Sequence, residues 1–366
     1  MQDILAHIDK PVKAAALLHD VGHGPFSHVF ERISEQKHEI WTEKIILDKD
    51  SRVYTVLVGA DIDPRDVAGI INKTYTPSLA VDIISSELDA DRMDYLLRDS
   101  HMCGVTYGQF DLEWMLHIMH AACVSIDAQT KLMKLCADAS KGIRAIEQYV
   151  LARIQMYEQV YFHKTTRAIE GLLGCILGCA RELMLKDNWD PPGADTITRK
   201  LLEGRDLELL EYQLLDEYCL VTAIASWAHM ECKNEKEQEL RMLSNNLLHR
   251  GKPFGYVDLT GRLINAGKVI QELNMNRPDL RFQWFVDNPE STVYKGILYS
   301  LERKESLEEQ VNSTIYVLKR GEPSPVEFDS AILKGLSGEK FKRHRLYYNR
   351  SKEEEFKQLF SKFELN

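Results

Sequence analysis

One ten-residue segment gathers three histidines and a carboxylate, which are side chains that can carry out acid–base and metal chemistry. The segment reads His19-Asp20-Val21-Gly22-His23-Gly24-Pro25-Phe26-Ser27-His28. Neutral imidazole and ionised carboxylate together ligate transition metals or a harder ion such as Mn or Mg. If the helix expected over residues 12–18 continues, His19 and Asp20 lie about 100° apart on it and can reach one ion. The glycines and proline that follow should break the helix and place His23 and His28 in a turn, where imidazoles can act as general acid or base.

This segment resembles the core motif of the HD-domain phosphohydrolases. Within them it is most similar to the deoxynucleoside triphosphate (dNTP) triphosphohydrolases. A lone His-Asp pair is common by chance, so the resemblance depends on the whole segment. It implies a divalent metal (Mn, Mg, Fe or Zn) held by His19 and Asp20. It also implies a reaction that turns a dNTP and water into a deoxynucleoside and tripolyphosphate.

The resemblance extends to two residues just beyond the segment, Glu31 and His38. They match positions that stand beside the scissile phosphate in the family. Together with His23 and His28, they are candidates for positioning phosphate and protonating the departing 5′-oxygen. For Glu31, a solvated helix carboxylate remains an equal alternative.

A second stretch, residues 85–99, places Asp91, Tyr95 and Asp99 at i, i+4 and i+8, which is one face of a helix. Such a face is usually only solvated, but the stretch resembles the family signature Asp-x-Asp-x-x-Asp-Tyr-x-x-Arg-Asp. The resemblance implies that Asp91 is the remote metal ligand, that Arg92 contacts phosphate, and that Tyr95 and Asp99 contact the sugar. A tyrosine ring at the sugar edge would reject a 2′-hydroxyl. The remaining charged residues of the stretch, Asp89, Asp94 and Arg98, are expected to be structural and ion-paired.

A third stretch carries Arg153, Tyr157, Tyr161 and Lys164 at i, i+4, i+8 and i+11, which predicts one stripe on a helix. Two cations and two aromatic rings suit a triphosphate and a nucleoside, although an amphipathic helix with basic residues is the plainer interpretation. The family carries Arg, Tyr and Lys at the positions of Arg153, Tyr161 and Lys164. Relatives have His where this chain has Tyr157, so the role of Tyr157 in substrate binding stays open.

The sequence departs from the family pattern upstream of His19. The family has a further metal-binding histidine there, in a His-Ser-Leu-Gly type segment that these residues do not contain. His7 is the one histidine before His19, and its spacing places it about 120° off the same helix face. Two alternatives therefore stay open beside the triphosphohydrolase. The chain could be another HD phosphohydrolase (a nucleotide monophosphatase or a nucleic-acid phosphodiesterase), or a catalytically impaired nucleotide-binding sensor or scaffold.

Composition favours an ordinary globular protein, with 366 residues, 44% hydrophobic and 28% charged. The net charge of −10 argues against indiscriminate binding to nucleic acid or an anionic membrane. The seven scattered cysteines include no CxxC pair and predict reduced thiols in the cytoplasm. Charged residues near the start predict no secretory signal, and the most apolar run, residues 171–180, is too short for a bilayer.

The elements that must position these residues are mainly α-helical. We expect an HD-domain helical bundle over residues 1–170, a helical extension over 171–251 and a smaller C-terminal α+β lobe over 252–366. Residues 1–8 read as the end of one helix and residues 9–11 as the start of the next. A loop is expected around 58–64, and strands within 281–286, 314–319 and 343–348.

A basic and aromatic cluster at residues 340–350 stands out in this acidic chain. It reads either as a strand edge protected by charge or as an anion site for a regulatory nucleotide, a subunit contact or single-stranded nucleic acid. Relatives bind activating nucleotides between subunits. The resemblance therefore implies an activating nucleotide and a homo-oligomer, a dimer or tetramer, with nucleic acid less favoured as a partner.

Overall fold

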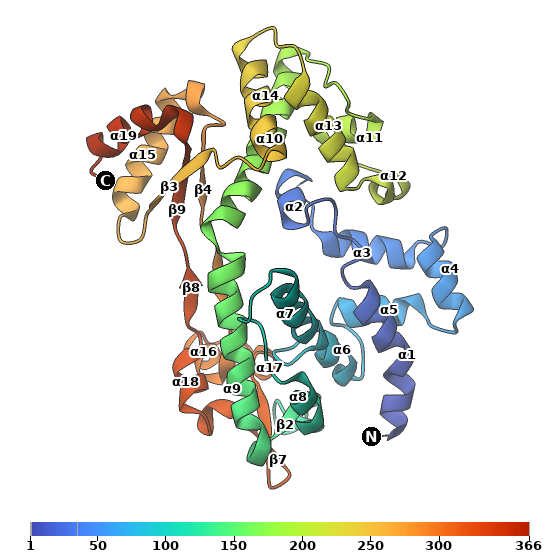
Figure 1. Ribbon diagram of the computed structural model, residues 1–366. Coiled ribbons are helices and arrows are strands. Elements are labelled where there is room, and N and C mark those ends of the chain that lie inside the picture. Colours follow the sequence, from blue (N-terminus) through green and yellow to red (C-terminus); the bar gives the residue numbers. More distant parts are fainter. Residues whose placement is uncertain (1, 35, 366) are drawn as a thin grey trace. The chain divides into compact units, whose positions relative to one another are not determined.

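The computed structural model describes residues 2–34 and 36–365, and it is mainly α-helical (Figure 1). Two compact units divide these residues, and both are assembled from separate stretches of the chain. The first unit comprises residues 1–22, 42–161 and 290–341, and the second comprises residues 23–41, 162–289 and 342–366. The three domain limits expected from the sequence stay predictions.

The first unit contains most of the early helices and a four-stranded sheet. Its helices are α1 (Gln2–Leu18), α4 (Arg52–Gly59), α5 (Pro64–Ile71), α6 (Ser78–Ile84), α7 (Ala90–Met102), α8 (Leu112–Ile118), α9 (Ala139–Met156), the π-helical turn η1 (Tyr157–Tyr161), α16 (Gly296–Glu302), α17 (Leu307–Asn312), the 3-10 turn η3 (Val326–Phe328) and α18 (Ala331–Leu336). Its strands are β1 (Met119–Ser125), β2 (Lys131–Asp138), β5 (Glu290–Thr292), β6 (Tyr316–Lys319) and β7 (Glu322–Pro325). The four-stranded sheet has the order β1-β2-β6-β7, and only its β2–β6 pair is parallel.

The second unit contains a long helix, α10 (Lys164–Asp187), whose buried residues form part of its largest core. Its helices are α2 (His28–Ser34), α10, α11 (Thr196–Glu203), α12 (Leu209–Leu214), α13 (Glu217–His229), α14 (Glu235–Leu248), α15 (Leu263–Asn276), the 3-10 turns η2 (Pro278–Leu280) and η4 (Arg350–Lys352), and α19 (Glu353–Lys362). Its strands β3 (Phe254–Asp258), β4 (Trp284–Asp287) and β9 (Arg345–Asn349) form an antiparallel sheet in which β9 is central. In Figure 1, α15 and α19 lie next to this sheet. Two elements span a unit limit, namely α3 (His38–Leu47) and β8 (Lys340–Lys342), which pairs with β5.

Each unit buries hydrophobic cores of its own. In the first, one core packs α1, α5 and α6 through residues such as Val12, Ile70 and Leu79, and another packs α7, α9 and β6. In the second, α10, α13 and α14 share a large core around Ile176 and Trp227, while β9, α15 and α19 share a smaller one. These cores hold the helices whose ends and faces carry the candidate site residues.

Several sequence expectations are confirmed, and one is wrong. The loop before Pro64, helices across residues 171–251, and strands within all three expected ranges are present. The expected break before Pro11 is wrong, because α1 runs unbroken from Gln2 to Leu18 with Pro11 inside it. Among the described residues, no helix combines the length and the apolar character needed to cross a bilayer.

Candidate active site

The first metal-ligand candidates lie just beyond the end of α1. His19 and Asp20 were expected to extend this helix, but they occupy the turn that follows it. The hydroxyl of Thr42 donates to the carbonyl of His19 (3.1 Å) and accepts from the backbone N–H of Gly22 (3.0 Å). These bonds replace the next helical bonds and fix the turn. The sequence offered no signal for the role of Thr42, which lies 23 residues after His19.

His19 faces two carboxylates within the first unit. Its Nε2 lies 3.2 Å from Oδ1 of Asp91 and 3.5 Å from Oδ2 of Asp20, while its Nδ1 donates to the carbonyl of Ala16 (2.9 Å). The hydrogen bond to Asp91 raises the pKa of His19 to about 9, with burial opposing the rise and the charge of Asp20 adding to it. One imidazole with its second nitrogen anchored to a carbonyl, together with two carboxylates, offers the kinds of donor that a divalent ion takes.

Asp91 reaches His19 because of how α7 begins. Asp89 caps the helix by accepting from the backbone N–H of Arg92 (2.7 Å), and it also accepts from Ser86 N–H (2.9 Å). Asp94 and Arg98 form an exposed ion pair at 3.0 Å. The sequence-based expectation that these three charged residues are structural is therefore confirmed.

The structure brings six of the predicted substrate-binding residues together in the first unit. Along α7, the carboxylate of Asp99 accepts from the hydroxyl of Tyr161 (2.8 Å), and the rings of Tyr95 and Tyr161 lie 6.3 Å apart. The rings of Tyr157 and Tyr161 lie 5.1 Å apart. Burial raises the pKa of Tyr95 above its usual range, so that phenol stays neutral near pH 7.

The remaining two of the six, Arg92 and Arg153, are held by carboxylates. Arg153 is only 5% exposed, and its Nη1 lies 2.8 Å from Oε2 of Glu87. Arg92 lies 3.2 Å from Asp89 and 3.9 Å from Glu87, and it donates to the carbonyl of Ser86. Glu87 is a site residue that the sequence analysis missed, and its position directly before the Asp-x-Asp signature was the one available signal.

The expected single stripe is interrupted at its centre. Arg153 lies in α9, but residues 157–161 form a π-helical turn, and Lys164 begins a new helix, α10, in the second unit. In a π-helical turn the backbone hydrogen bonds join residues five apart, and in an α-helix they join residues four apart. Residues after this turn therefore no longer lie on the helix face that α-helical spacing from Arg153 predicts. Lys164 instead places its ammonium group 5.5 Å from the ring centre of Tyr256.

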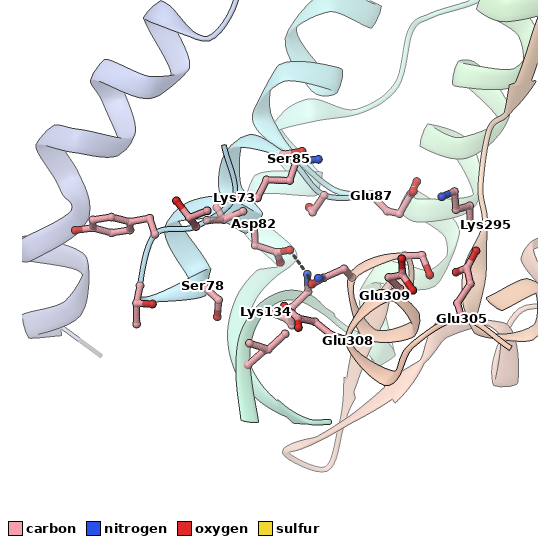
Figure 2. Close-up of a pocket in the computed structure, with 18 of the residues that line it drawn as sticks. Lys73, Ser78, Asp82, Ser85, Glu87, Lys134, Lys295, Glu305, Glu308 and Glu309 are labelled. Atoms are coloured by element: carbon pink, nitrogen blue, oxygen red, sulfur yellow. Dashed lines mark hydrogen bonds and ion pairs between the residues drawn. The ribbon is translucent and has the colours of Figure 1, made fainter. Parts of the chain in front are cut away.

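A polar cavity of about 680 Å³ opens in the first unit beside Arg92 (Figure 2). Glu87 and Arg92 contribute to its wall, and the ion pair between Asp82 and Lys134 forms part of its floor. Glu305 and Glu309 approach from α17 and the loop before it. Of the predicted site residues, Arg92 lines this cavity.

The four predicted acid–base residues form a separate cluster in the second unit. Glu31 accepts from His28 Nδ1 (3.2 Å), from the backbone N–H of His38 (3.1 Å) and from His38 Nδ1. The rings of His23 and His38 stack with their centres 3.8 Å apart. Burial alone would raise the pKa of Glu31, but the bonds from His38 and His28 outweigh it and lower the pKa to about 2.

A strained turn presents His28 at the start of α2. Phe26 and Ser27 adopt left-handed backbone conformations (φ 62° and 50°), which are uncommon for residues with side chains. A Cβ atom on Gly24 would lie 2.6 Å from the ring of Phe30, so a glycine is needed there. The N–H of Phe26 donates to Glu217 (3.3 Å) and anchors the turn.

The basic cluster at residues 340–350 is mostly engaged. Arg345 is buried and donates to the carbonyl of Phe162 (2.8 Å), and Lys340 pairs with Glu290 (2.5 Å). Because β9 is the central strand of its sheet, the interpretation as a protected strand edge is wrong for Arg345–Asn349. Arg350 does line a cavity of about 200 Å³ in the second unit, together with Lys164, Lys252 and Tyr256.

Comparisons with known proteins agree with the motifs. The family model described as "HD domain" matches residues 3–99. An uncharacterized protein of Bacillus subtilis, YwfO, is 34% identical over 342 residues, which is 92% of this chain and 72% of that protein. A Dictyostelium discoideum homolog of the deoxynucleoside triphosphate triphosphohydrolase SAMHD1 is 26% identical over 262 residues, 62% of this chain and 48% of that protein.

A solved structure agrees with the fold. The crystal structure of a phosphohydrolase from Bacteroides thetaiotaomicron superposes with a TM-score of 0.71 at 24% identity, covering 94% of this chain and 80% of that one. The motif segments, the family model and the extended match to YwfO lead to the same conclusion. The chain belongs to the HD-domain superfamily.

Proposed function

We propose that this chain is a metal-dependent triphosphohydrolase, which turns a dNTP and water into a deoxynucleoside and tripolyphosphate. The observation that carries the proposal is the approach of Asp91 to within 3.2 Å of His19, with Tyr95 and Asp99 following on the same helix. The proposed metal ligand and the proposed sugar-binding face would therefore lie on one rigid element.

His19, Asp20 and Asp91 would hold the divalent ion. Such an ion polarises a phosphoryl oxygen and lowers the pKa of bound water. Arg92 and Arg153 would bind phosphate oxygens through charge-assisted hydrogen bonds once the substrate displaces Glu87. Tyr95 and Asp99 would contact the sugar, with Tyr157 and Tyr161 packing beside them.

Proton transfer is assigned to the cluster of His23, His28, Glu31 and His38. Water adds to the α-phosphorus and releases a proton to solvent, the bond from that phosphorus to the 5′-oxygen breaks, and the departing oxygen takes a proton from an imidazolium. His28 is the residue that we propose donates it, because its side chain is 72% exposed and Glu31 orients its Nδ1.

The activating nucleotide implied by the family resemblance has a candidate site in the second unit. The cavity lined by Lys164, Lys252 and Arg350 presents three cations beside the ring of Tyr256. A homo-oligomer and a cytoplasmic location remain part of the same proposal.

The reaction is tested by its products. Purified protein is incubated with each of the four dNTPs and with GTP, first in Mg and then in Mn, and the products are separated by ion exchange. We expect deoxynucleoside and tripolyphosphate. Inorganic phosphate released from monophosphates, or shortened labelled DNA, would replace the proposal by one of the other hydrolase activities, and no turnover at all would favour a nucleotide-binding scaffold.

Two matched pairs of variants test the residue assignments. Asp91→Asn should abolish turnover, whereas Asp94→Asn, on the exposed side of the same helix, should leave it unchanged. His28→Ala should abolish turnover while nucleotide binding stays largely intact, and the exposed His101→Ala is its control. Full activity in His28→Ala would contradict the proton-transfer role.

A further inference from the structure

The cluster of His23, His28, Glu31 and His38 has a second chemical capability. One ligand atom from each of the four side chains lies within 4.8 Å of the ligand atoms of the other three. All four belong to the second unit, in the strained turn, in α2 and at the first residue of α3. Four donors converge here within sixteen residues of chain.

The donor set differs from the one at His19. Three imidazoles and one carboxylate suit Zn²⁺, Co²⁺, Ni²⁺ or Cu²⁺, whereas one imidazole and two carboxylates also accept Mg²⁺ and Mn²⁺. In a tetrahedral site the ligands lie about 2.0–2.2 Å from the ion, so neighbouring ligand atoms are about 3.3–3.6 Å apart. The widest pair of ligand atoms is therefore at most about 1.5 Å further apart than in a loaded site, a difference that side-chain rotation can close.

Surrounding contacts already orient the ligands. The backbone N–H of His38 donates to Oε1 of Glu31 (3.1 Å), and the rings of His23 and His28 meet edge to face at 5.2 Å. Contacts of this kind around a ligand set fix its geometry. His28 is exposed, which leaves a route by which an ion can enter from solvent.

We propose that these four residues form a second metal site, selective for Zn²⁺-type ions and separate from the site of His19, Asp20 and Asp91. Four protein ligands complete a tetrahedron and leave no position for water or substrate, as in structural zinc sites. An imidazole nitrogen that binds the ion cannot also transfer a proton. The loaded cluster therefore inhibits hydrolysis, and this inhibition, unlike the binding itself, rests on the proposed function.

Cobalt binding tests the site directly. The protein is stripped with a chelator and titrated with Co²⁺, whose visible absorption is intense in tetrahedral and weak in octahedral coordination. The titration is made in the Asp91→Asn background, which disables the first site. We expect one intensely absorbing Co²⁺ per chain, displaced by one equivalent of Zn²⁺.

Two variants and one control locate that ion. His28→Ala removes an exposed ligand with little risk to folding, and His38→Ala removes a less exposed one. Each should weaken Zn²⁺ binding at least tenfold and abolish the intense band, while His101→Ala should leave both unchanged. Weak octahedral absorption, or unchanged binding in His28→Ala, would overturn the proposal.

The outcome is separable from that of the proposed function. If Co²⁺ binds tetrahedrally but no dNTP is hydrolysed, the second site stands and the activity falls. If dNTPs are hydrolysed but the intense band never forms, the activity stands and the second site falls. If both hold, Zn²⁺ should inhibit turnover over the same concentrations at which it binds the cluster. Inhibition by Zn²⁺ in a variant that lacks the intense Co²⁺ band would contradict the proposal that the loaded cluster causes the inhibition.

Discussion

The cysteines differ in how far water reaches their sulfur atoms. Cys103 and Cys123 are exposed, whereas Cys136, Cys175 and Cys179 are buried, and all seven are free thiols. Burial raises the pKa of Cys136 and of Cys175 to about 12. Because the thiolate is the reactive form, burial and the raised pKa act together to make these two sulfurs inert.

We therefore expect selective alkylation of the native protein. At pH 8, iodoacetamide should label Cys103 and Cys123 within minutes, while Cys136 and Cys175 stay unlabelled until the chain is unfolded. Raising the pH from 7 to 9 should leave Cys136 and Cys175 unlabelled, because burial and the raised pKa keep both thiols protonated. Peptide mapping by mass spectrometry reads the result, and equal labelling of Cys136 and Cys103 would contradict it.

For Arg153, the sequence predicts the family position of the residue but not its ion-pair partner. Its type and its family position were predictable, but its pairing with Glu87, 66 residues away, was not. Nothing local marks such a pair, because it depends on how α9 packs beside the start of α7. The ion pairing of Asp94 with Arg98 could be predicted, because both lie one turn apart on a single helix.

Some helices and strands could also be located from the sequence, and others could not. The strands β4, β6 and β9 are rich in aromatic and branched residues and could be located from the sequence. β1 and β2 were missed, because Met119–Ser125 and Lys131–Asp138 show no regular alternation of apolar and polar residues. The π-helical turn η1 was missed because it begins within a pattern that fits a continuous α-helix equally well.

A buried ion pair joins α6 to β2. The side chains of Asp82 and Lys134 are 4% and 5% exposed. Asp82 also accepts from the N–H of Leu135 (2.6 Å), and Lys134 also donates to Asn312 (3.1 Å). Burial raises the pKa of Asp82, because it disfavours the charged carboxylate. The charge of Lys134 and the hydrogen bonds from Lys134 and Leu135 oppose this rise and stabilise the charged form.

Removing one partner of this pair should destabilise the fold strongly. Lys134→Met leaves Asp82 buried without its counter-charge, a change that costs about 3–5 kcal/mol, and the double variant with Asp82→Asn should recover part of the loss. Urea unfolding measures both variants. The exposed pair gives the control, since Arg98→Met should change stability by less than about 1 kcal/mol. Similar losses at the two sites would show that Asp82 is not isolated from water.

At the scale of the whole molecule, the chain passes between its two units after residues 22, 41, 161, 289 and 341. Fold class and most helices were predictable because they follow local periodicity. This interleaving was not, because it depends on which distant segments share a core. The last segment, residues 342–366, supplies the central strand β9 and the helix α19 to the second unit.

Deleting residues 342–366 should unfold much of the second unit. The deletion removes five buried residues from the core shared by β9, α15 and α19: Leu346, Phe356, Leu359, Phe360 and Leu365. At about 2 kcal/mol each, their loss is about 10 kcal/mol, as large as the stability of a whole domain. We expect the shortened chain to bind a hydrophobic dye and to lose part of the cooperative melting transition seen for the full chain. An unchanged melting temperature would contradict this.

The position of β9 in the chain also determines when this protein can fold during its synthesis. β3 and β4 leave the ribosome earlier, but both pair with β9, so each stays an open edge until residues 345–349 have been added. The proposed acid–base cluster at residues 23–38 belongs to this same unit and is synthesised before β9. A nascent chain therefore carries the residues of this cluster before the unit that holds them is complete.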